Sequence, residues 1–358
     1  QGGVLLGADV VALHTPTGTS YEAVTGGDGR FSFQNVRVGG PYTITVRMAG
    51  FREQIIQNVN VNLGEATAVQ ARLQLETVQE TVTVTAEASA VFSGARSGTS
   101  GTISEAAIET LPTVQRSLQD FARVNPFVSQ TATNANDSAL SIAGRSGRYN
   151  NLQIDGAVNN DLFGLADTAT PGGQAATQPV SLDAIQELQS AVSPCDVRQG
   201  GFSGGGINAI TRSGTNRLRG TAYYFFRDQD LVGDGASDRP IATVSDKQFG
   251  GSAGGPFVKN RAFFFSNFDF GRKETPSGFS VDGSSGQAFG RQDEIQRALA
   301  VLQTRYNYNP GGIGEFIRET NNNKVFVRGD VNLGKSQLTV RHNFVDAFND
   351  VLFPSITS

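Results

Sequence analysis

The sequence contains no tryptophan, and it has only one cysteine, Cys195, and two histidines, His14 and His342. A single cysteine cannot form an internal disulfide, and one thiol with two imidazoles so far apart in sequence is a poor set of zinc ligands. No run of about 18 apolar residues is present, so a transmembrane helix is not expected. That absence leaves room for a transmembrane β-barrel, whose strands need only about 10 residues of alternating polarity.

Charged residues are also few, with 29 Lys and Arg against 33 Asp and Glu and a net charge of −4. The basic residues are scattered along the chain rather than grouped. A scattered distribution lacks the basic patch that binds phosphate backbones, so we expect no nucleic-acid partner. The scarcity of metal-ligating side chains likewise predicts no metal centre and no cofactor.

Glycine and phenylalanine are abundant, with 43 and 24 residues, which favours a mainly β fold. In residues 1–75, short alternating runs are separated by turn residues such as Gly39-Gly40-Pro41. Short strands with turns between them predict a small β-sandwich. The expected strands are 8–14, 20–25, 30–36, 42–48, 53–61 and 66–75.

Residues 76–98 show β-branched alternation that ends in small polar residues, and we interpret them as a linker able to become a strand. Residues 99–216 mix helical and β patterns. Capping residues and apolar spacing predict helices at three places in this region. They are "TISEAAIETLP" with Ser104 as cap, "SLQDFARV", and "SLDAIQELQSA" with Ser181 as cap.

From residue 217 onward the pattern becomes one of long strands with two different faces. In "KVFVRGDVNL", apolar Val325, Val327 and Val331 alternate with polar Arg328 and Asp330. The runs "LRGTAYYFFR", "AFFFSNFDF" and "QLTVRHNF" alternate in the same way. Alternation is typical of a membrane barrel, but a half-buried sheet of a soluble protein alternates too, so the pattern alone leaves both open.

Connection lengths in this region are unequal. Short turns, at 256–261 and 334–335, join some strands, whereas long polar stretches near 228–246 and 271–323 join others. Short turns at one end and long loops at the other are the arrangement of outer-membrane barrels. Within the second stretch, apolar residues at helical spacing predict a short loop helix over Gln292–Tyr306.

Three stretches carry a resemblance to a known family. "SLDAIQELQSAVSPCDVRQGGFSGGGINAITRSGTNRLRGTAYYFFRDQDLVG" (181–233) is similar to the plug-to-barrel junction of TonB-dependent outer-membrane receptors, specifically the Oar-like group. "FGGSAGGPFVKNRAFFFSNFDFGR" (249–272) resembles the next barrel hairpin of that group, and "GRSGRYNNLQIDGAVNND" (144–161) resembles its plug core. Residues 1–75 resemble the carboxypeptidase regulatory-like domain that precedes the plug, so the resemblance covers nearly the whole chain.

The resemblance implies four parts. They are a carboxypeptidase regulatory-like β-sandwich at 1–75, a linker with a TonB box at 76–98, an α+β plug domain at 99–216, and the start of a transmembrane antiparallel β-barrel at 217–358. The family's barrel has about 22 strands, and an open barrel leaves unpaired backbone groups in lipid, so we interpret the chain as a piece cut at both ends. Cys195 stands where the family commonly has an aromatic residue.

The linker segment "ETVTVTAEA" (80–88) resembles a TonB box. The resemblance implies that this segment pairs as an added strand with TonB, the periplasmic partner of an inner-membrane energising complex, and β-branched residues suit strand addition. The alternative is that the segment is the last strand of the N-terminal domain. The residues assigned to the box are Glu80, Thr81, Val82, Thr83, Val84, Thr85 and Ala86.

The function implied by the resemblance is energised uptake of a large or scarce ligand, with a plug that gates the barrel. The chain would lie in the cell outer membrane, with its N-terminal domain and TonB box in the periplasm. Its partners would be TonB, outer-membrane lipid and an unknown extracellular peptide, glycan or metal chelate. A second hypothesis is a non-transporting surface protein for adhesion or carbohydrate binding, built on the same sandwich.

A basic and aromatic stretch within the plug core offers candidate ligand contacts at the plug apex. The same side chains suit an alternative role, which is to pair with carboxylates of the barrel wall, and this is the interpretation that we favour. The candidates are Arg145, Arg148, Tyr149 and Asn151.

Two further motifs suggest chemistry. Residues 201–205 fit G-x-S-x-G, but a nucleophile elbow needs a following helix and a His base, whereas a strand is expected here, so we predict no enzyme and no catalytic residue. A second cluster offers oxygen ligands to calcium, but its spacing is not that of an EF-hand, so we favour Asx turns as its explanation. That cluster is Asp155, Asn159, Asn160 and Asp161.

Overall fold

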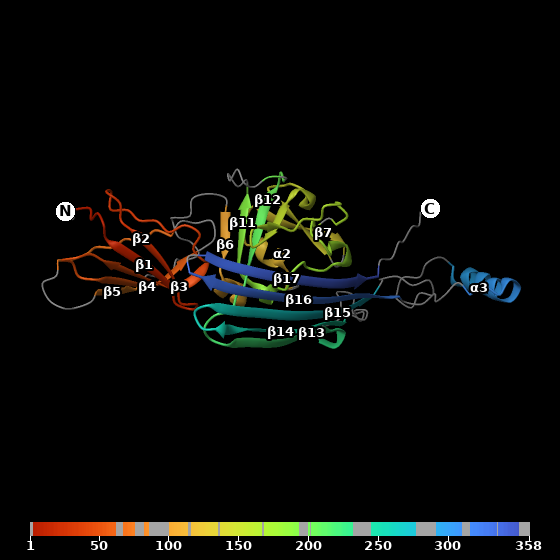
Figure 1. Ribbon diagram of the computed structural model, residues 1–358. Helices are drawn as coiled ribbons and strands as arrows, with labels where there is room; N and C mark the ends of the chain where they lie inside the picture. The colour runs from red at the N-terminus through yellow and green to blue at the C-terminus, as the bar shows by residue number, and fades with distance from the viewer. Residues whose placement is uncertain are drawn as a thin grey trace.

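The computed structural model of the chain forms three units that follow one another in sequence (Figure 1). An N-terminal sheet lies at one end, a central unit follows, and five long strands form a sheet beside the central unit. The residues that the structure describes are 3–61, 67–75, 82–85, 100–113, 116–134, 137–166, 168–192, 200, 202–231, 245–276, 291–309, 316–334 and 336–350. Cys195 lies outside them.

The N-terminal unit is one five-stranded sheet in the order β2-β1-β3-β4-β5. Alternate residues of its strands are buried, and Val10, Ile44 and Val46 are at most 5% exposed. This period of two is what a sheet with one covered face requires. The strands are β1 (Asp9–His14), β2 (Thr19–Val24), β3 (Gly39–Arg47), β4 (Gln54–Val61) and β5 (Val82–Thr85).

The opposite layer of this unit differs from the expectation. The predicted strands at 30–36 and 66–75 are wrong, because the described residues there form no strand, apart from a single bridge between Leu75 and Phe51. These segments run across the sheet and pack Phe31, Phe33 and Leu73 on its core. Side-chain burial, rather than a hydrogen-bonded ladder, therefore holds this layer of the sandwich in place.

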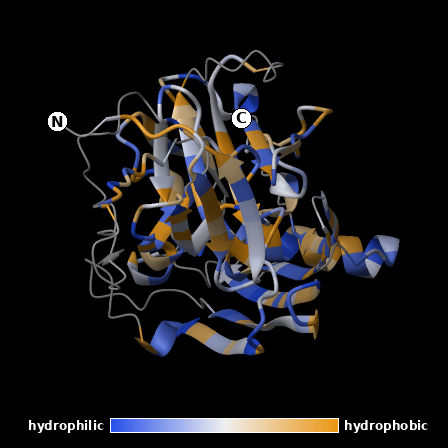
Figure 2. Cartoon of the chain, turned by 60° about the vertical axis from the view of Figure 1, so that its left-hand side comes forward, coloured by the Kyte–Doolittle hydropathy of each residue, from blue (hydrophilic) through white to orange (hydrophobic). Residues whose placement is uncertain are grey.

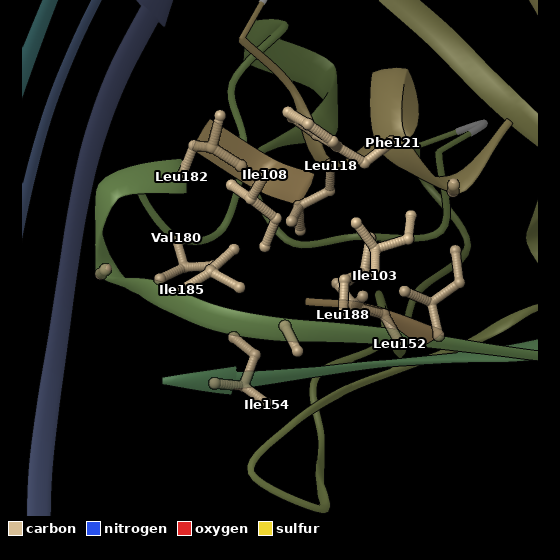
Figure 3. Packing of buried hydrophobic residues seen from close by; sticks show 14 of the residues in the cluster. Ile103, Ile108, Leu118, Phe121, Leu152, Ile154, Val180, Leu182, Ile185 and Leu188 are labelled. Carbon is tan, nitrogen blue, oxygen red and sulfur yellow. The ribbon is translucent and has the colours of Figure 1, made fainter. Parts of the chain in front are cut away.

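The central unit, the plug, is an α+β fold around a five-stranded sheet in the order β10-β9-β12-β11-β6. Short helices cover the sheet, and apolar side chains from both meet in one core (Figure 3). Phe121 and Leu188, each 1% exposed, lie at its centre. Its elements are β6 (Ser100–Ile103), α1 (Glu105–Thr110), α2 (Leu118–Ala122), β7 (Val128–Asn134), β8 (Asp137–Ile142), η1 (Gly147–Tyr149), β9 (Asn151–Ile154), β10 (Ala157–Val158), η2 (Gly173–Ala175), η3 (Leu182–Ala184), β11 (Ile185–Val192) and β12 (Gly205–Thr211).

Two of the three helices predicted in this region are present. Ser104 occupies the N-cap position of α1 without a side-chain bond, whereas Ser117 caps α2 by accepting from the amide of Asp120 at 3.2 Å. The third prediction is wrong, because the segment after Ser181 makes one 3-10 turn and continues as strand β11. Strand β11 lies between β12 and β6, and pairing on both sides outweighs the weak helical spacing of its apolar residues.

The C-terminal unit is an antiparallel sheet in the order β13-β14-β15-β16-β17. Its strands are up to 17 residues long and run roughly across the direction of β11 and β12 (Figure 1). Strand extends further than predicted, over 271–276 and 317–323, which were expected to be loop. The elements are β13 (Arg219–Asp228), η4 (Gln229–Leu231), β14 (Ser245–Val258), β15 (Ala262–Pro276), α3 (Gln292–Tyr306), β16 (Ile317–Leu333) and β17 (Ser336–Asn349).

The register of these strands sorts their side chains onto two faces. Phe268 lies opposite Val325, which lies opposite Phe344, and this row faces away from the plug with exposed fractions of 46%, 37% and 52%. In the next row, Asp269 lies opposite Lys324, and both are buried toward the plug. Figure 2 shows the resulting alternation of hydrophobic and hydrophilic bands along the strands. The predicted two-faced strands are therefore present, with an apolar outer face and a largely polar inner face.

Helix α3 matches the helix predicted over the same residues and lies beyond the far end of the long strands (Figure 1). It has Asp293 and Glu294 in its first turn and Arg305 in its last, which complements the helix dipole at both ends. No helix among the described residues is both long enough and apolar enough to cross a membrane.

Candidate functional site: the interface between plug and strands

The inner face of β13–β17 holds the plug through a buried carboxylate. Asp269, 1% exposed, accepts hydrogen bonds from Tyr223 Oη at 2.6 Å and from Gln248 Nε2 at 2.7 Å. Lys324 Nζ lies 3.1 Å from the same carboxylate and forms an ion pair with it. From the plug, the hydroxyl of Ser181 donates to Asp269 at 3.3 Å. Strand order and register bring these groups together, because Lys324 pairs directly with Asp269 across β15 and β16.

A second polar cluster lies near the short turns of the sheet. Arg328 on β16 donates through Nη1 to the carbonyl and hydroxyl of Thr211, at 2.9 and 2.8 Å. Thr211, the last residue of β12, in turn donates from its amide and hydroxyl to Asp155, both at 2.7 Å. Arg341 on β17 pairs with the same carboxylate at 2.7 Å. Strands β16 and β17 of the sheet thus both bind the plug at Thr211 and Asp155.

Asp330 completes this cluster, which we call the rim network (Asp155, Thr211, Arg328, Asp330 and Arg341). Its side chain is fully buried, pairs with Arg328 at 2.9 Å and accepts from the hydroxyl of Thr339 at 2.8 Å. A buried carboxylate without such donors would be costly, so the surrounding residues are arranged to satisfy it.

Close backbone packing accompanies these contacts. A Cβ added at Gly214 would lie 2.3 Å from the carbonyl oxygen of Phe264 and 2.6 Å from that of Gly255. Glycine therefore lets the chain that leaves the plug run directly against β14 and β15. This approach explains part of the glycine-rich, low-volume sequence that precedes β13.

A polar cavity of about 100 Å³ lies between plug and strands, toward the end of the sheet opposite the short turns. Arg116 and Thr177 line it from the plug, and Arg272 and Lys273 line it from β15. Arg116 also pairs with Asp183 at 2.6 Å and stacks over the ring of Phe225 at 4.2 Å. Basic and amide side chains predominate around this space, whereas the rim network lies at the other end of the same interface.

The predicted apex residues occupy different environments. Arg145, Arg148 and Tyr149 are exposed, and Tyr149 is 57% exposed. Asn151 is 2% exposed and accepts from the side-chain amide of Asn160 at 3.1 Å, so it lies inside the plug. The structure therefore presents three of the four side chains at the plug surface.

In the predicted oxygen-ligand cluster after β9, Asp155 belongs to the rim network, whereas Asn160 and Asp161 bond to nearby backbone amides. Asn160 accepts from the amide of Leu152 at 2.8 Å, and Asp161 accepts from the amides of Phe163 and Ala166 at 3.0 and 2.7 Å. These backbone donors, the bond from Ala166 above all, lower the pKa of the Asp161 carboxyl. The described residues contain no group of three or more metal-ligating side chains that could hold an ion.

The Ser203 motif precedes strand β12 rather than a helix, as expected. A nucleophile elbow needs a helix at that place, so the local geometry does not provide one.

Of the segment predicted as a TonB box, the structure describes Val82–Thr85, which form β5. This strand runs parallel to β4 at the edge of the N-terminal sheet, with Gln54 opposite Val82 and Gln57 opposite Thr85. Glu80, Thr81 and Ala86 lie outside the described residues. Among the residues that the structure describes, no strand pairs with the other side of β5, and an open side is the geometry that strand addition uses.

Arg37, which sequence reasoning did not single out, projects from the N-terminal unit to the sheet. Its Nη2 atom lies 3.2 Å from Asp330, and its side chain is 9% exposed. Burial lowers the pKa of the Arg37 guanidinium, and the negative charge of Asp330 opposes that shift. Burial and the nearby Arg37 together lower the pKa of His14 to about 4.

Comparison with known proteins gives two matched domains. Residues 1–74 match the carboxypeptidase regulatory-like domain, and residues 210–310 match an outer membrane beta barrel domain. Among curated proteins, the chain is similar to the TonB-dependent transporter Oar of Myxococcus xanthus, with 25% identity over 282 residues. That similarity covers 73% of this chain and 25% of the relative, so the chain spans about a quarter of its length.

Among solved structures, the chain is similar to the siderophore receptor PirA of Acinetobacter baumannii, with 18% identity and a TM-score of 0.48 over 70% of this chain and 32% of that one. It is also similar to the outer membrane transporter YddB of Escherichia coli, with 15% identity and a TM-score of 0.47 over 70% of this chain and 33% of that one.

Proposed function

We propose that this chain, which belongs to the TonB-dependent receptors and lies in the outer membrane, is part of a transporter that takes up a large or scarce ligand with energy supplied through TonB. The curated relative that it matches is a transporter rather than an enzyme.

One observation carries the proposal. The five long strands have an exposed apolar face on one side and the plug on the other. An apolar face of this extent is unfavourable in water and favourable in lipid. Its outward residues are Leu218, Tyr224, Phe226, Phe249, Phe257, Phe268, Val325, Val327, Val331, Leu333, Leu338, Val340, Phe344 and Phe348.

The plug would block the lumen at rest and rearrange during uptake. Its contacts with the sheet include hydrogen bonds and ion pairs, such as those of Asp269 and of the rim network, beside the buried rings of Phe265 and Phe326. Hydrogen bonds to charged groups contribute about 1.5–3 kcal/mol each net, because water replaces the lost partners when such a contact opens. A wall held to the plug in this way permits the plug to move in a hydrated lumen at modest cost.

The proposed roles are assigned to the four parts expected from the sequence, whose boundaries lie near residues 75, 98 and 216. The short turns of the sheet would face the periplasm, together with the N-terminal unit and the segment 80–86. That segment would serve as the TonB box, because β5 already has the extended backbone that strand addition needs. Main-chain hydrogen bonds would then transmit the pull of TonB without a specific side chain.

The ligand class proposed is a peptide, glycan or metal chelate. Exposed Arg145, Arg148 and Tyr149 are the candidate contacts on the plug surface. Asn151 is assigned a supporting role, because its side chain is buried against Asn160.

The test is uptake by cells that carry variants of segment 80–86 in the intact receptor. A growth screen of a deletion strain on candidate nutrients first identifies a transported ligand. Deleting 80–86 should then abolish uptake while leaving binding of that ligand unchanged. Val84→Pro should have the same effect, because proline removes a main-chain donor.

A matched control keeps the length and composition of the segment but permutes the order of its Thr and Val residues. This variant should retain most of the uptake, because its backbone can still pair. Uptake that survives both the deletion and the proline would refute the assignment of the box, and a receptor that binds no ligand at the cell surface would refute the transporter.

A further inference from the structure

The N-terminal unit rests on the short-turn rim, by which we mean Asn216, the turn 258–261 and the turn at 332–334. The amide of Asn216 donates to the carbonyl of Pro16 at 2.8 Å, and Asn332 Nδ2 donates to the hydroxyl of Thr19 at 2.9 Å. Gly18 lies so close to Asn260 that an added Cβ would be 2.2 Å from its side-chain oxygen. These contacts come from the β1–β2 turn, so one end of the unit sits against the rim.

Arg37 makes the charged contact of this interface. Its guanidinium reaches Asp330, whose side chain is fully buried, and the distance between Nη2 and Oδ1 is 3.2 Å. The backbone at Arg37 is fixed from inside the N-terminal unit, because Tyr42 Oη donates to its carbonyl at 2.7 Å and its amide donates to Tyr21 Oη at 3.3 Å. Two tyrosines therefore hold the arginine in the position that meets the rim.

The Arg37 contact is ionic but poorly hydrogen-bonded. Both terminal nitrogens, Nη1 and Nη2, are buried, and within the described part of the chain they make no hydrogen bond of good geometry. Burying a guanidinium in this way forfeits hydrogen bonds with water, which offsets much of the attraction to Asp330. When the two units separate, the guanidinium of Arg37 regains its hydrogen bonds with water. The net free energy of the contact is therefore small, which suits a contact that opens and closes rather than a permanent one.

Asp330 also supports the contact between the five-stranded sheet and the plug. It orients Arg328 through bonds of 3.0 and 2.9 Å, and Arg328 Nη1 donates to Thr211 of the plug. Movement of Thr211 away from the wall would remove two hydrogen bonds from Arg328 Nη1, and a shift of Arg328 would change the electrostatic potential at Asp330 and Arg37. The carboxylate of Asp330 thus interacts both with Arg37 of the N-terminal unit and with Arg328 of the five-stranded sheet.

From this arrangement we propose that the N-terminal unit is a releasable dock on the short-turn rim, fixed by Arg37, and that movement of the plug loosens it through Asp330 and Arg328. The proposed orientation makes this rim periplasmic, and in that respect the inference rests on the proposed function. Because β5 is paired with β4 of the same unit, a pull on β5 would exert force on the contact between the N-terminal unit and the short-turn rim as well as on the plug.

Disulfide formation across the interface measures docking directly. In the intact receptor with Cys195→Ser, the pair Thr19→Cys and Asn332→Cys replaces two side chains that touch at 2.9 Å. The pair should form a disulfide in resting outer membranes. Adding Arg37→Met should slow its formation by about tenfold, the effect of losing roughly one charged contact, and Arg37→Lys should slow it less. Asp155→Asn, which weakens the contacts of the plug with Arg328 and Arg341 but does not touch the N-terminal unit, should slow it by about twofold to fivefold.

Arg30→Met is the matched control, because Arg30 is on the same unit but its side chain is 88% exposed. It should leave the rate unchanged. Absence of the disulfide in the starting receptor, or an unchanged rate with Arg37→Met, would overturn the dock. An unchanged rate with Asp155→Asn would overturn its coupling to the plug. The assay needs neither TonB nor ligand, so its failure is distinguishable from failure of the transporter proposal.

Discussion

Replacing Asp269 with asparagine should destabilise the five-stranded sheet and its contact with the plug more than any change at an exposed ion pair. The carboxylate is 1% exposed and receives donors from Ser181, Tyr223, Gln248 and Lys324. Asparagine keeps the shape of the side chain but removes its charge. Lys324, whose side chain is 8% exposed, would then be a buried cation without its counter-ion.

The magnitude follows from this burial. Removing one partner of a buried pair typically costs about 3–5 kcal/mol, mainly because the remaining charge is uncompensated. Lys324→Met should cost about 2–4 kcal/mol, since the carboxylate would retain its neutral donors. The double variant should cost clearly less than the sum, with a coupling of about 2–3 kcal/mol, because the second substitution removes a charge that the first left unpaired.

Urea unfolding of the intact receptor in lipid vesicles measures these free energies. Asp246→Asn is the control, because Asp246 pairs with Arg227 at 3.1 Å but the two side chains are 33% and 43% exposed. Solvent screens such a pair, so the control should cost no more than about 1 kcal/mol. Strictly additive effects of Asp269→Asn and Lys324→Met would refute the buried ion pair, as would a cost no larger than that of the control.

Other substitutions test separate parts of the structure. Acidification should destabilise the N-terminal unit: since the pKa of His14 is lowered from 6.5 to about 4 in the folded state, its contribution is complete above pH 6.5 and falls as the pH drops toward 4. The loss should reach up to about 3 kcal/mol, seen as faster amide exchange in β1 and β3, and His14→Gln should remove this dependence. Gly214→Ala should cost about 1–3 kcal/mol, because its Cβ meets two backbone carbonyls, whereas Gly27→Ala, with no atom of the described residues within 4 Å of the added Cβ, should be neutral in the same unfolding assay. Phe121→Ala should cost about 3–5 kcal/mol by leaving a cavity in the plug core, and an effect below 1 kcal/mol would contradict the packing in Figure 3.

The two-faced strands were predictable from sequence, because a period of two in Val325, Val327 and Val331 has one geometric meaning in a long strand. Strand β11 was not, since Ile185 and Leu188 fit a helix by spacing and a strand by pairing. Only its neighbours on both sides decide between the two. The missing ladders at 30–36 and 66–75 have a similar cause, because apolar alternation reports burial and not hydrogen bonding.

The site was less accessible to sequence reasoning. The sequence identified Asp155 as one of four clustered residues that offer oxygen ligands to a metal. It could not identify the partner Arg341, which lies 186 residues away. Polar residues on an alternating strand, such as Asp269 and Asp330, indicate an inner face without naming their partners. No sequence pattern indicated a role for Arg37, because a single arginine before a strand is common. Its role follows only from the fold, which brings it to Asp330.

The orientation of β16 toward lipid is the claim on which the rest depends. Nitroxide labels placed one at a time at residues 324–331 of the intact receptor in bilayers report accessibility to oxygen, which partitions into lipid, and to a water-soluble nickel reagent. Labels at Val325, Val327 and Val331 should be oxygen-accessible, and those at Phe326 and Asp330 should be shielded from it, with a period of two. Oxygen accessibility that is uniform along the strand, or highest at Phe326 and Asp330, would contradict a barrel wall with the plug inside.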